Sequence, residues 1–423
     1  YTEENTLSLH DALPIFFRDP VVFLTQWLNG VLAGWGLPPA WVQVISFTIG
    51  GAILATGAML FVTILIWGER KLLGRVQDRY GPNRLGPWGI FQSFADMLKI
   101  FIKEHITPVG VDLIPYNLAP ILSVAAVLMV WSVIPLSMTM YGVDLSVGLL
   151  YFVAVGALGE LGIIMAGWGS NNKYALLGAF RAVAQLISYE VPMVVSLLVP
   201  VMLAGSLSMN EIVKQQNIWF IFISPLAALI FFVTQIAEVG RAPFDLVEAE
   251  SELVAGFNIE YSGLKFGMFF VAEFVHAFTV ALIFTTLFLG GWRGPGAEQY
   301  PLLGFIYLML KTTIVYFIAI LMRGSLPRFR IDQMMDVNWK LLTPLSLILI
   351  AVTALAVKAM QPLSPWISVP VNIVLNLILI YLTQQLLVRY FKRRKIREVG
   401  SRNRPVARLE EPVTSTAESE GSL

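Results

Sequence analysis

Long apolar runs alternate with short polar stretches along most of the chain. A helix needs about 20 apolar residues to cross ~30 Å of hydrocarbon, and nine runs approach or exceed that length. The run at 190–206 is the shortest, and the last run contains Asn372 and Asn376. The pattern predicts an all-α polytopic membrane protein with about nine transmembrane helices, at 42–67, 116–137, 145–168, 190–206, 218–238, 266–289, 302–322, 341–360 and 368–390.

The positions of these runs divide the chain into three parts. Residues 1–40 are expected to form an N-terminal interfacial segment, because 15–40 are mixed apolar and contain Trp27 and Trp35. Residues 41–390 form the predicted transmembrane helical domain, with large polar loops at 68–114 and 239–265. Residues 391–423 are first basic and then acidic, which is typical of a disordered tail.

The first loop contains an amphipathic segment at 89–104. Gln92, Asp96, Lys99 and Lys103 lie away from its apolar face. We expect an amphipathic helix in the membrane interface, although a helix packed on a soluble partner fits the pattern equally well. The apolar face is made of Ile90, Phe91, Phe94, Met97, Leu98, Phe101 and Ile102.

Composition supports membrane insertion and excludes several functions. The chain has 423 residues, 57% of them hydrophobic and 13% charged, whereas soluble domains carry roughly 25% charged residues. It has no cysteine and only three scattered histidines, so we expect no disulfide, no cysteine-ligated iron–sulfur cluster and no other metal site. It also lacks the glycine-rich nucleotide fingerprints. Any redox cofactor is therefore expected in another chain.

Basic residues are distributed unevenly between alternate loops. The loop 68–114 holds seven of them, 323–340 holds four and the tail after residue 390 holds eight, whereas the loops on the opposite side hold at most one each. Because basic loops face the cytoplasm, we expect the C-terminus inside and the N-terminus outside. This orientation requires an odd number of spans, in agreement with nine.

An acidic stretch lies between two of the apolar runs, at 238–260. It holds six carboxylates and a single basic residue, Arg241. Pro243 suits the first turn of a helix, and spacings of three and four would place Asp245, Glu248 and Glu252 on one face. A solvated acidic helix would explain the pattern, as would a role in handling protons.

Four glutamates fall within or at the ends of apolar runs: Glu160, Glu190, Glu238 and Glu273. Such residues cost roughly 2.5–3.5 kcal/mol each on insertion and usually mark a pathway. Glu190 and Glu238 are expected at the cytoplasmic ends of their spans, and all four in the cytoplasmic half. A single buried glutamate often only forms a hydrogen bond to a neighbouring helix. Four glutamates at a similar depth in the membrane, beside an acidic loop, favour a proton path.

Four long motifs, in this order, resemble the H subunit family of proton-pumping NADH:quinone oxidoreductase, respiratory complex I. They are GERKLLGRVQDRYGPNRLGPWGIFQSFADMLKIFIKE (68–104), LGELGIIMAGWGSNNKYALLGAFRAVAQLISYEVPM (158–193), AEVGRAPFDLVEAESELVAGFNIEYSGLKFGMFFVAEF (237–274) and LPRFRIDQMM (326–335). The resemblance covers roughly residues 42–345. Members of that family commonly have eight spans and some have nine, so the run at 368–390 is a departure in length that leaves the motifs intact.

The resemblance implies roles for residues in two groups. One group matches the residues that border the family's quinone cavity: Arg70, Arg79, Asp96, Lys99, Arg323, Arg328, Arg330 and Asp332. The other matches its buried acidic channel and acidic loop: Glu160, Glu190, Glu238, Asp245, Glu248, Glu250, Glu252 and Glu260. Glu273 joins the second group because of its position within an apolar run.

The expected function is that of the membrane subunit of a bacterial plasma-membrane NADH:quinone oxidoreductase, which couples quinone reduction to proton translocation. Quinone would be the substrate, and NADH, flavin and iron–sulfur clusters would bind only to partner subunits. The implied partners are the hydrophilic quinone-site subunits, small membrane subunits, antiporter-like subunits and the lipid bilayer, with no nucleic acid. Two alternatives remain: the equivalent subunit of a membrane-bound hydrogenase, and a stand-alone cation/proton antiporter, although we find no internal repeat of the kind antiporters often show.

The orientation can be tested by cysteine labelling, because the chain has no native cysteine. A cysteine placed within the basic run at 392–397 should react with a membrane-impermeant reagent only after the cells are opened. Labelling from outside intact cells would reverse the proposed orientation.

Overall fold

The computed structural model describes residues 19–245, 254–360, 369–385 and 388, and every regular element within them is a helix. The chain divides into two units, Tyr1–Asn376 and Leu377–Leu423. The second unit is described only at the end of the helix Val369–Gln385 and at residue 388. The prediction of an all-α polytopic membrane protein is confirmed.

Seven of the described helices are long and apolar enough to cross a membrane. Two shorter apolar helices are α10 (Pro225–Glu238) and Val369–Gln385. The seven long ones are α3 (Pro39–Val76), α5 (Leu113–Trp131), α6 (Gly148–Gly169), α7 (Lys173–Ala204), α12 (Gly263–Phe288), α13 (Pro301–Ser325) and the continuous stretch Ile331–Ala359. That last stretch contains α14 (Ile331–Val337), a π-helical turn (Asn338–Leu342) and most of α15 (Thr343–Met360).

The remaining described elements are short or lie beside the bundle. They are α2 (Pro20–Gly34), a 3₁₀ turn (Pro87–Gly89), α4 (Gln92–Ile102), α8 (Met209–Gln215), α9 (Phe220–Ile223) and a second 3₁₀ turn (Gly256–Asn258). The segment expected to be an amphipathic helix at 89–104 is thus helical over α4. Its place in the membrane interface remains a prediction.

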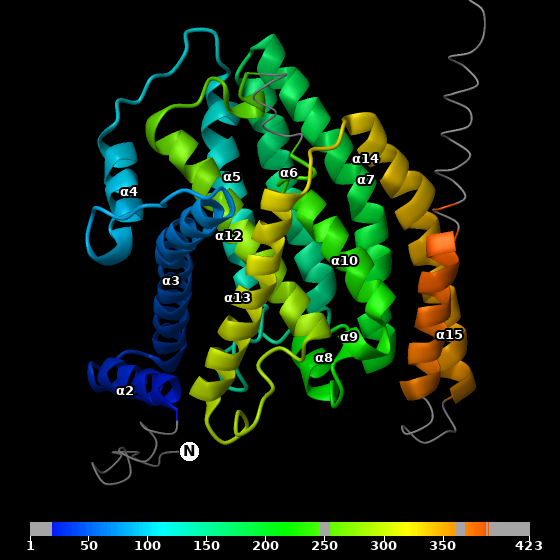
Figure 1. The fold of residues 1–423 in the computed structure, drawn as a ribbon. Coiled ribbons are helices and arrows are strands. Elements are labelled where there is room, and N and C mark those ends of the chain that lie inside the picture. The colour runs from blue at the N-terminus through cyan, green and yellow to red at the C-terminus, as the bar shows by residue number, and fades with distance from the viewer. Residues whose placement is uncertain (1–18, 246–253, 361–368, 386–387, 389–423) are drawn as a thin grey trace, which may run out of the picture. The chain divides into compact units, whose positions relative to one another are not determined.

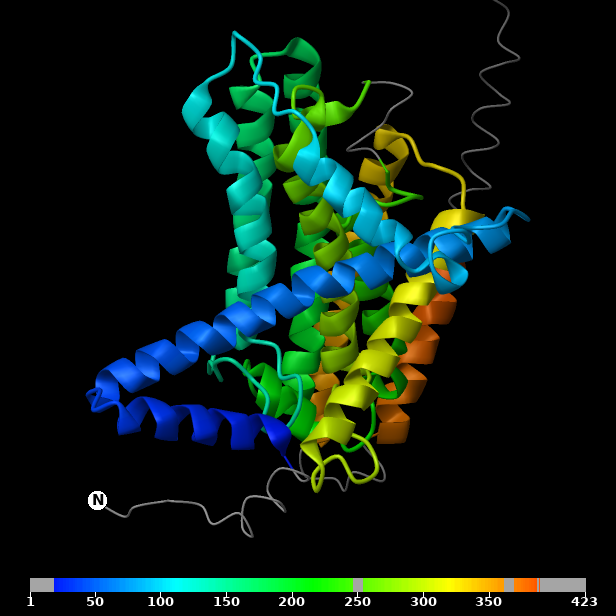
Figure 2. The same cartoon turned by 90° about the vertical axis from the view of Figure 1, so that its left-hand side faces the viewer.

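The first unit is centred on α12, the most buried of the seven long helices. It packs against α5 and α13, while α7 packs against α6 and α10 (Figure 1). Small residues allow close contact between α5 and α6: a Cβ atom on Gly162 would lie 2.5 Å from Oγ of Ser123, as is common where membrane helices touch. Figure 2 shows α3 inclined across the upright helices, with α2 beside its first half.

Helix α7 is longer than the apolar pattern predicts. It begins at Lys173, so the predicted span 190–206 is only its second half. Polar residues in the first half of α7 lower its hydropathy, so the apolar pattern does not predict that the helix begins at Lys173. Gln185, for example, is fully buried and donates hydrogen bonds to the carbonyls of Ala237 (2.8 Å) and Phe244 (3.0 Å).

The predicted span 218–238 is instead two helices, α9 and α10, separated at Ser224. Pro225 disfavours helical geometry at the preceding residue, and Ser224 has φ −134° and ψ 72°. Asn376 lies at this break: its Nδ2 donates to the carbonyl of Ile223 (3.3 Å), and its Oδ1 accepts from the Ser224 hydroxyl (3.1 Å). Asn376 lowers the hydropathy of the predicted span 368–390. In the structure it supplies hydrogen-bond partners at the break between α9 and α10.

Candidate functional site

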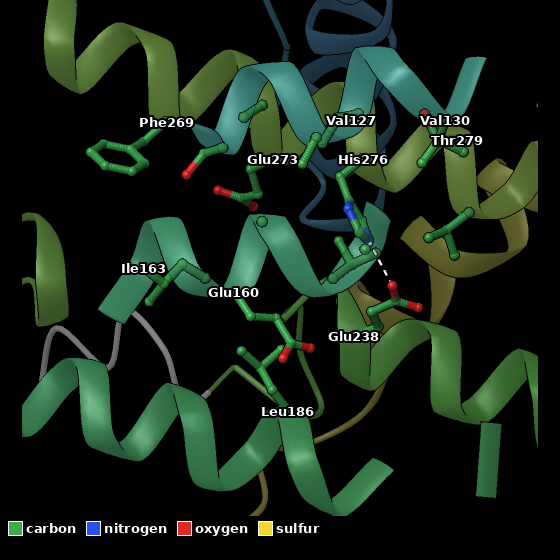
Figure 3. A pocket seen from close by; sticks show the side chains of 18 of the residues that line it. Val127, Val130, Glu160, Ile163, Leu186, Glu238, Phe269, Glu273, His276 and Thr279 are labelled. Atoms are coloured by element: carbon green, nitrogen blue, oxygen red, sulfur yellow. Dashed lines mark ion pairs between the residues drawn. The ribbon is translucent and has the colours of Figure 1, made fainter. Parts of the chain in front are cut away.

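A cavity of about 150 Å³ lies among α5, α6, α7, α10 and α12 (Figure 3). Most of its lining is apolar, with valine, leucine and phenylalanine side chains. Three carboxylates interrupt this lining: Glu160 from α6, Glu238 from α10 and Glu273 from α12. His276 and Tyr189 also line the cavity. Three of the four glutamates singled out from the sequence therefore face one cavity.

The helix positions explain this convergence. Glu273 and His276 are three residues apart on α12, so they share a face. Glu238 is the last residue of α10, as its place at the end of an apolar run predicted. Its Oε1 lies 3.2 Å from Nε2 of His276, and its side chain is only 9% exposed.

Glu190 occupies a different place from the one expected. It lies near the middle of α7, because that helix begins at Lys173, and the expectation of a helix-end position is wrong. It is absent from the cavity lining but close enough to interact electrostatically with Glu160 and Glu238. A negative charge on one of these carboxylates therefore influences the others through a medium of low dielectric constant.

A second cluster adjoins the cavity and was missed by the sequence reasoning. The Glu69 carboxylate, only 4% exposed, accepts from Nη1 of Arg241 (2.8 Å) and also pairs with Arg323. The Tyr316 hydroxyl donates to the same carboxylate at 3.1 Å. Nε of Arg241 lies 3.6 Å from the carboxylate of Glu273. Ion pairs therefore run from Arg323 through Glu69 and Arg241 to the cavity.

Arg241 keeps its charge within this cluster. Burial alone would lower its pKa, but the neighbouring Tyr316, Glu69 and Glu273 raise it above the usual value. The guanidinium also lies over the Phe274 ring, 4.6 Å from the centroid, which adds a favourable cation–π contact. Arg241 is thus a permanent positive charge between the buried carboxylate of Glu69 and the half-buried carboxylate of Glu273.

Glu69 was overlooked because the predicted first span stops at residue 67. The structure continues α3 to Val76, which places Glu69 on a helix inside the bundle rather than in a loop. Arg241 was noted only as the single basic residue of the acidic stretch. That isolation was the available signal, since a lone arginine among carboxylates is a natural ion-pair partner.

The residues expected to border a quinone cavity are brought together only in part. Arg70 on α3 pairs with Asp96 on α4, which also accepts from Gln92 (3.3 Å). Arg323 joins the Glu69 cluster instead. The others lie exposed on loops or helix surfaces: Arg79, Lys99, Arg328, Arg330 and Asp332.

Only the two ends of the acidic stretch can be placed. Ala242 and Pro243 form a turn and no helix has begun by Asp245, so a helix starting at Pro243 is wrong. The carbonyl of Pro243 instead accepts from the backbone N–H of Phe329 (2.9 Å). Glu260 accepts a hydrogen bond from Asn172 (2.6 Å), the residue that caps α7. Glu248, Glu250 and Glu252 lie outside the described residues.

Comparison with known proteins establishes the family. A family model described as NADH dehydrogenase matches residues 49–354. The chain belongs to the NADH dehydrogenase family. Relatives within it include the H subunit of NADH-quinone oxidoreductase from Dehalococcoides mccartyi (strain CBDB1), 45% identical over 352 residues that cover 83% of this chain and 96% of the relative.

Two further NADH dehydrogenase family members give the same result. The H subunit from Geobacillus sp. (strain WCH70) is 46% identical over 319 residues, covering 75% of this chain and 96% of its own. The H subunit from Geobacillus kaustophilus (strain HTA426) is 46% identical over 338 residues, covering 79% and 99%. The resemblance to the H subunit family seen in the four motifs is confirmed.

The Glu69 cluster predicts an unequal response to two similar substitutions. Glu69→Gln removes the charge that two guanidinium groups share and should cost about 3–5 kcal/mol of stability, as expected when a buried pair loses one member. Glu211→Gln removes only an exposed partner of Lys214 and should be nearly silent. Thermal release of the chain from the purified complex measures both. Equal melting temperatures for the two variants would show that the cluster adds no net stability.

Proposed function

We propose that this chain is the membrane subunit of an NADH:quinone oxidoreductase that forms part of the quinone cavity and passes protons along buried carboxylates. The observation that carries the proposal is the mostly apolar cavity in which Glu160, Glu238 and Glu273 converge from three helices. The relatives named as H subunits of NADH-quinone oxidoreductase support the same reading. No feature of the described residues favours the hydrogenase or antiporter alternatives over it.

The quinone side of the proposed mechanism begins at the ends of α3 and α13. Arg70 with Asp96, and Arg323 with Glu69, are charged pairs that a quinone head group or its reduced anion would meet. Arginine suits this task because its planar donors bind oxygen acceptors in a defined geometry. Arg79, Lys99, Arg328, Arg330 and Asp332 would complete the rim together with partner subunits.

The coupling step follows from the chain of ion pairs. Negative charge that forms near Arg323 weakens the ion pair between Arg323 and Glu69. Arg241 then pairs more strongly with one of its two carboxylate partners. Because Glu273 lines the cavity, its proton affinity changes with the position of Arg241. The neighbouring Glu160, Glu190 and Glu238 respond through the low-dielectric medium. The acidic stretch 245–260 would connect this path to the quinone.

This function implies partners and a location. The chain binds quinone as substrate, while flavin, iron–sulfur clusters and NADH belong to hydrophilic partner subunits. Protons leave the cavity toward small membrane subunits and antiporter-like subunits. The complex lies in a bacterial plasma membrane, with the basic loops on the cytoplasmic side.

The proposed carboxylate path predicts that quinone reduction and proton pumping are lost together when one of its glutamates cannot ionise. Glu238→Gln and Glu190→Gln keep the side-chain shape but remove the ability to ionise, so each should lower quinone reduction and proton pumping together in assembled complex. Both activities are measured in proteoliposomes containing the complex. Glu211→Gln, on an exposed helix surface, is the matched control and should change neither. Normal pumping by both buried variants would disprove the path.

The proposed position of Arg70 at the quinone cavity predicts the loss of one activity and the retention of another. Arg70→Ala should lower NADH:quinone reductase activity about tenfold, the effect of roughly 1.4 kcal/mol, while NADH oxidation by an artificial acceptor stays unchanged. Arg293→Ala serves as the control, because the hydrogen bonds described for the Arg293 side chain go only to Lys214 and Asn217. Parallel loss of both activities in Arg70→Ala would indicate failed assembly rather than a quinone contact.

A further inference from the structure

One titratable group in the cavity has no part in the proposed coupling step: the imidazole of His276. The chain contains three histidines. His105 is exposed on the loop after α4, and His10 lies outside the described residues. His276 alone among the cavity-lining residues carries a ring that can accept a proton at one nitrogen and release it from the other.

The ring lies directly against a carboxylate of the path. Figure 3 shows its imidazole pointing from α12 toward Glu238 on α10, with 3.2 Å between Nε2 and Oε1. Neither Nε2 of His276 nor Oε2 of Glu238 has a hydrogen-bond partner among the described residues. Buried polar atoms without partners cost about 1–3 kcal/mol each, so their presence here calls for a functional explanation.

Other groups that exchange or stabilise protons surround the pair on each side. Glu160 faces the cavity from α6 and Tyr189 from α7. Glu273 lies three residues before His276 on α12 and is tied to Arg241. The ring therefore stands between Glu238 and a carboxylate whose partner is the fixed cation of the ion-pair chain.

We propose that His276 is a proton-relay residue that exchanges a proton with Glu238 and passes it to the other carboxylates of the cavity. This inference rests on the proposed function. In the forward step the Glu238 carboxyl O–H breaks and an Nε2–H bond forms, which leaves a carboxylate beside an imidazolium. The imidazolium then loses the proton at Nδ1 to the Glu273 carboxylate or to water in the cavity, which leaves the neutral ring as the Nε2–H tautomer. A ring flip or a second proton exchange then restores the Nδ1–H tautomer for the next transfer. The proton is conserved, and no oxidant or reductant takes part.

A purely structural role makes a different prediction. If the ring only filled space or held Glu238 by a hydrogen bond, an amide of similar size would replace it. Asparagine and glutamine donate and accept hydrogen bonds but do not take up a proton near neutral pH. Amide substitution therefore separates proton transfer from hydrogen bonding.

The test uses the whole complex in proteoliposomes. His276→Asn and His276→Gln should assemble, retain NADH oxidation by an artificial acceptor, and lose about tenfold in both quinone reduction and pumping. This loss is smaller than general acid–base catalysis typically contributes, because water can replace part of the transfer. His276→Ala should be slow in the same way, and added imidazole should restore it by entering the space left by the ring. His105→Gln is the matched control and should be silent.

The outcomes distinguish this inference from the proposed function. Amide variants at the wild-type rate, an alanine variant that imidazole does not restore, or loss of assembly in all three variants would each overturn the relay role of His276. If Glu238→Gln is impaired while the amide variants are normal, the carboxylate path stands and only His276 is removed from it. Imidazole should not restore Glu238→Gln, because the missing group there is a carboxylate.

Discussion

The bundle depends on how one buried arginine is neutralised. Arg241 follows α10 directly and reaches Glu69 on α3, Glu273 on α12 and Tyr316 on α13. A guanidinium in an apolar interior is tolerated only when paired and hydrogen-bonded. These contacts therefore tie four helices to a single charge. Through Glu69 they also link Arg323 to the cavity at Glu273.

The cavity owes its properties to the contrast between its walls and its few polar groups. Its apolar lining lowers the local dielectric constant, so charges on Glu160 and Glu238 influence each other, while Glu273 interacts with Arg241. In water the same carboxylates would all ionise with little influence on one another. The apolar surroundings thus allow Glu160, Glu190 and Glu238 to influence one another electrostatically.

Much of the architecture was readable from the sequence. Apolar runs located most of the helices, and the four motifs indicated the family, because hydropathy and motif order are local properties of the chain. Intramembrane glutamates were recognisable for the same reason, since an ionisable residue within an apolar run stands out by itself. Three of them do line a single cavity.

Tertiary structure alone decided the helix ends and the partners. The first half of α7 is helical although Lys173, Arg181 and Gln185 interrupt its apolar sequence, and Gln185 donates to carbonyls on another segment. The break at Ser224 and its partner Asn376 are far apart in the chain. Glu69 and Arg241 are separated by 172 positions, and no local pattern links them. Sequence determines which residues are costly to bury, whereas only the packed helices determine which opposite charge lies close enough to offset that cost.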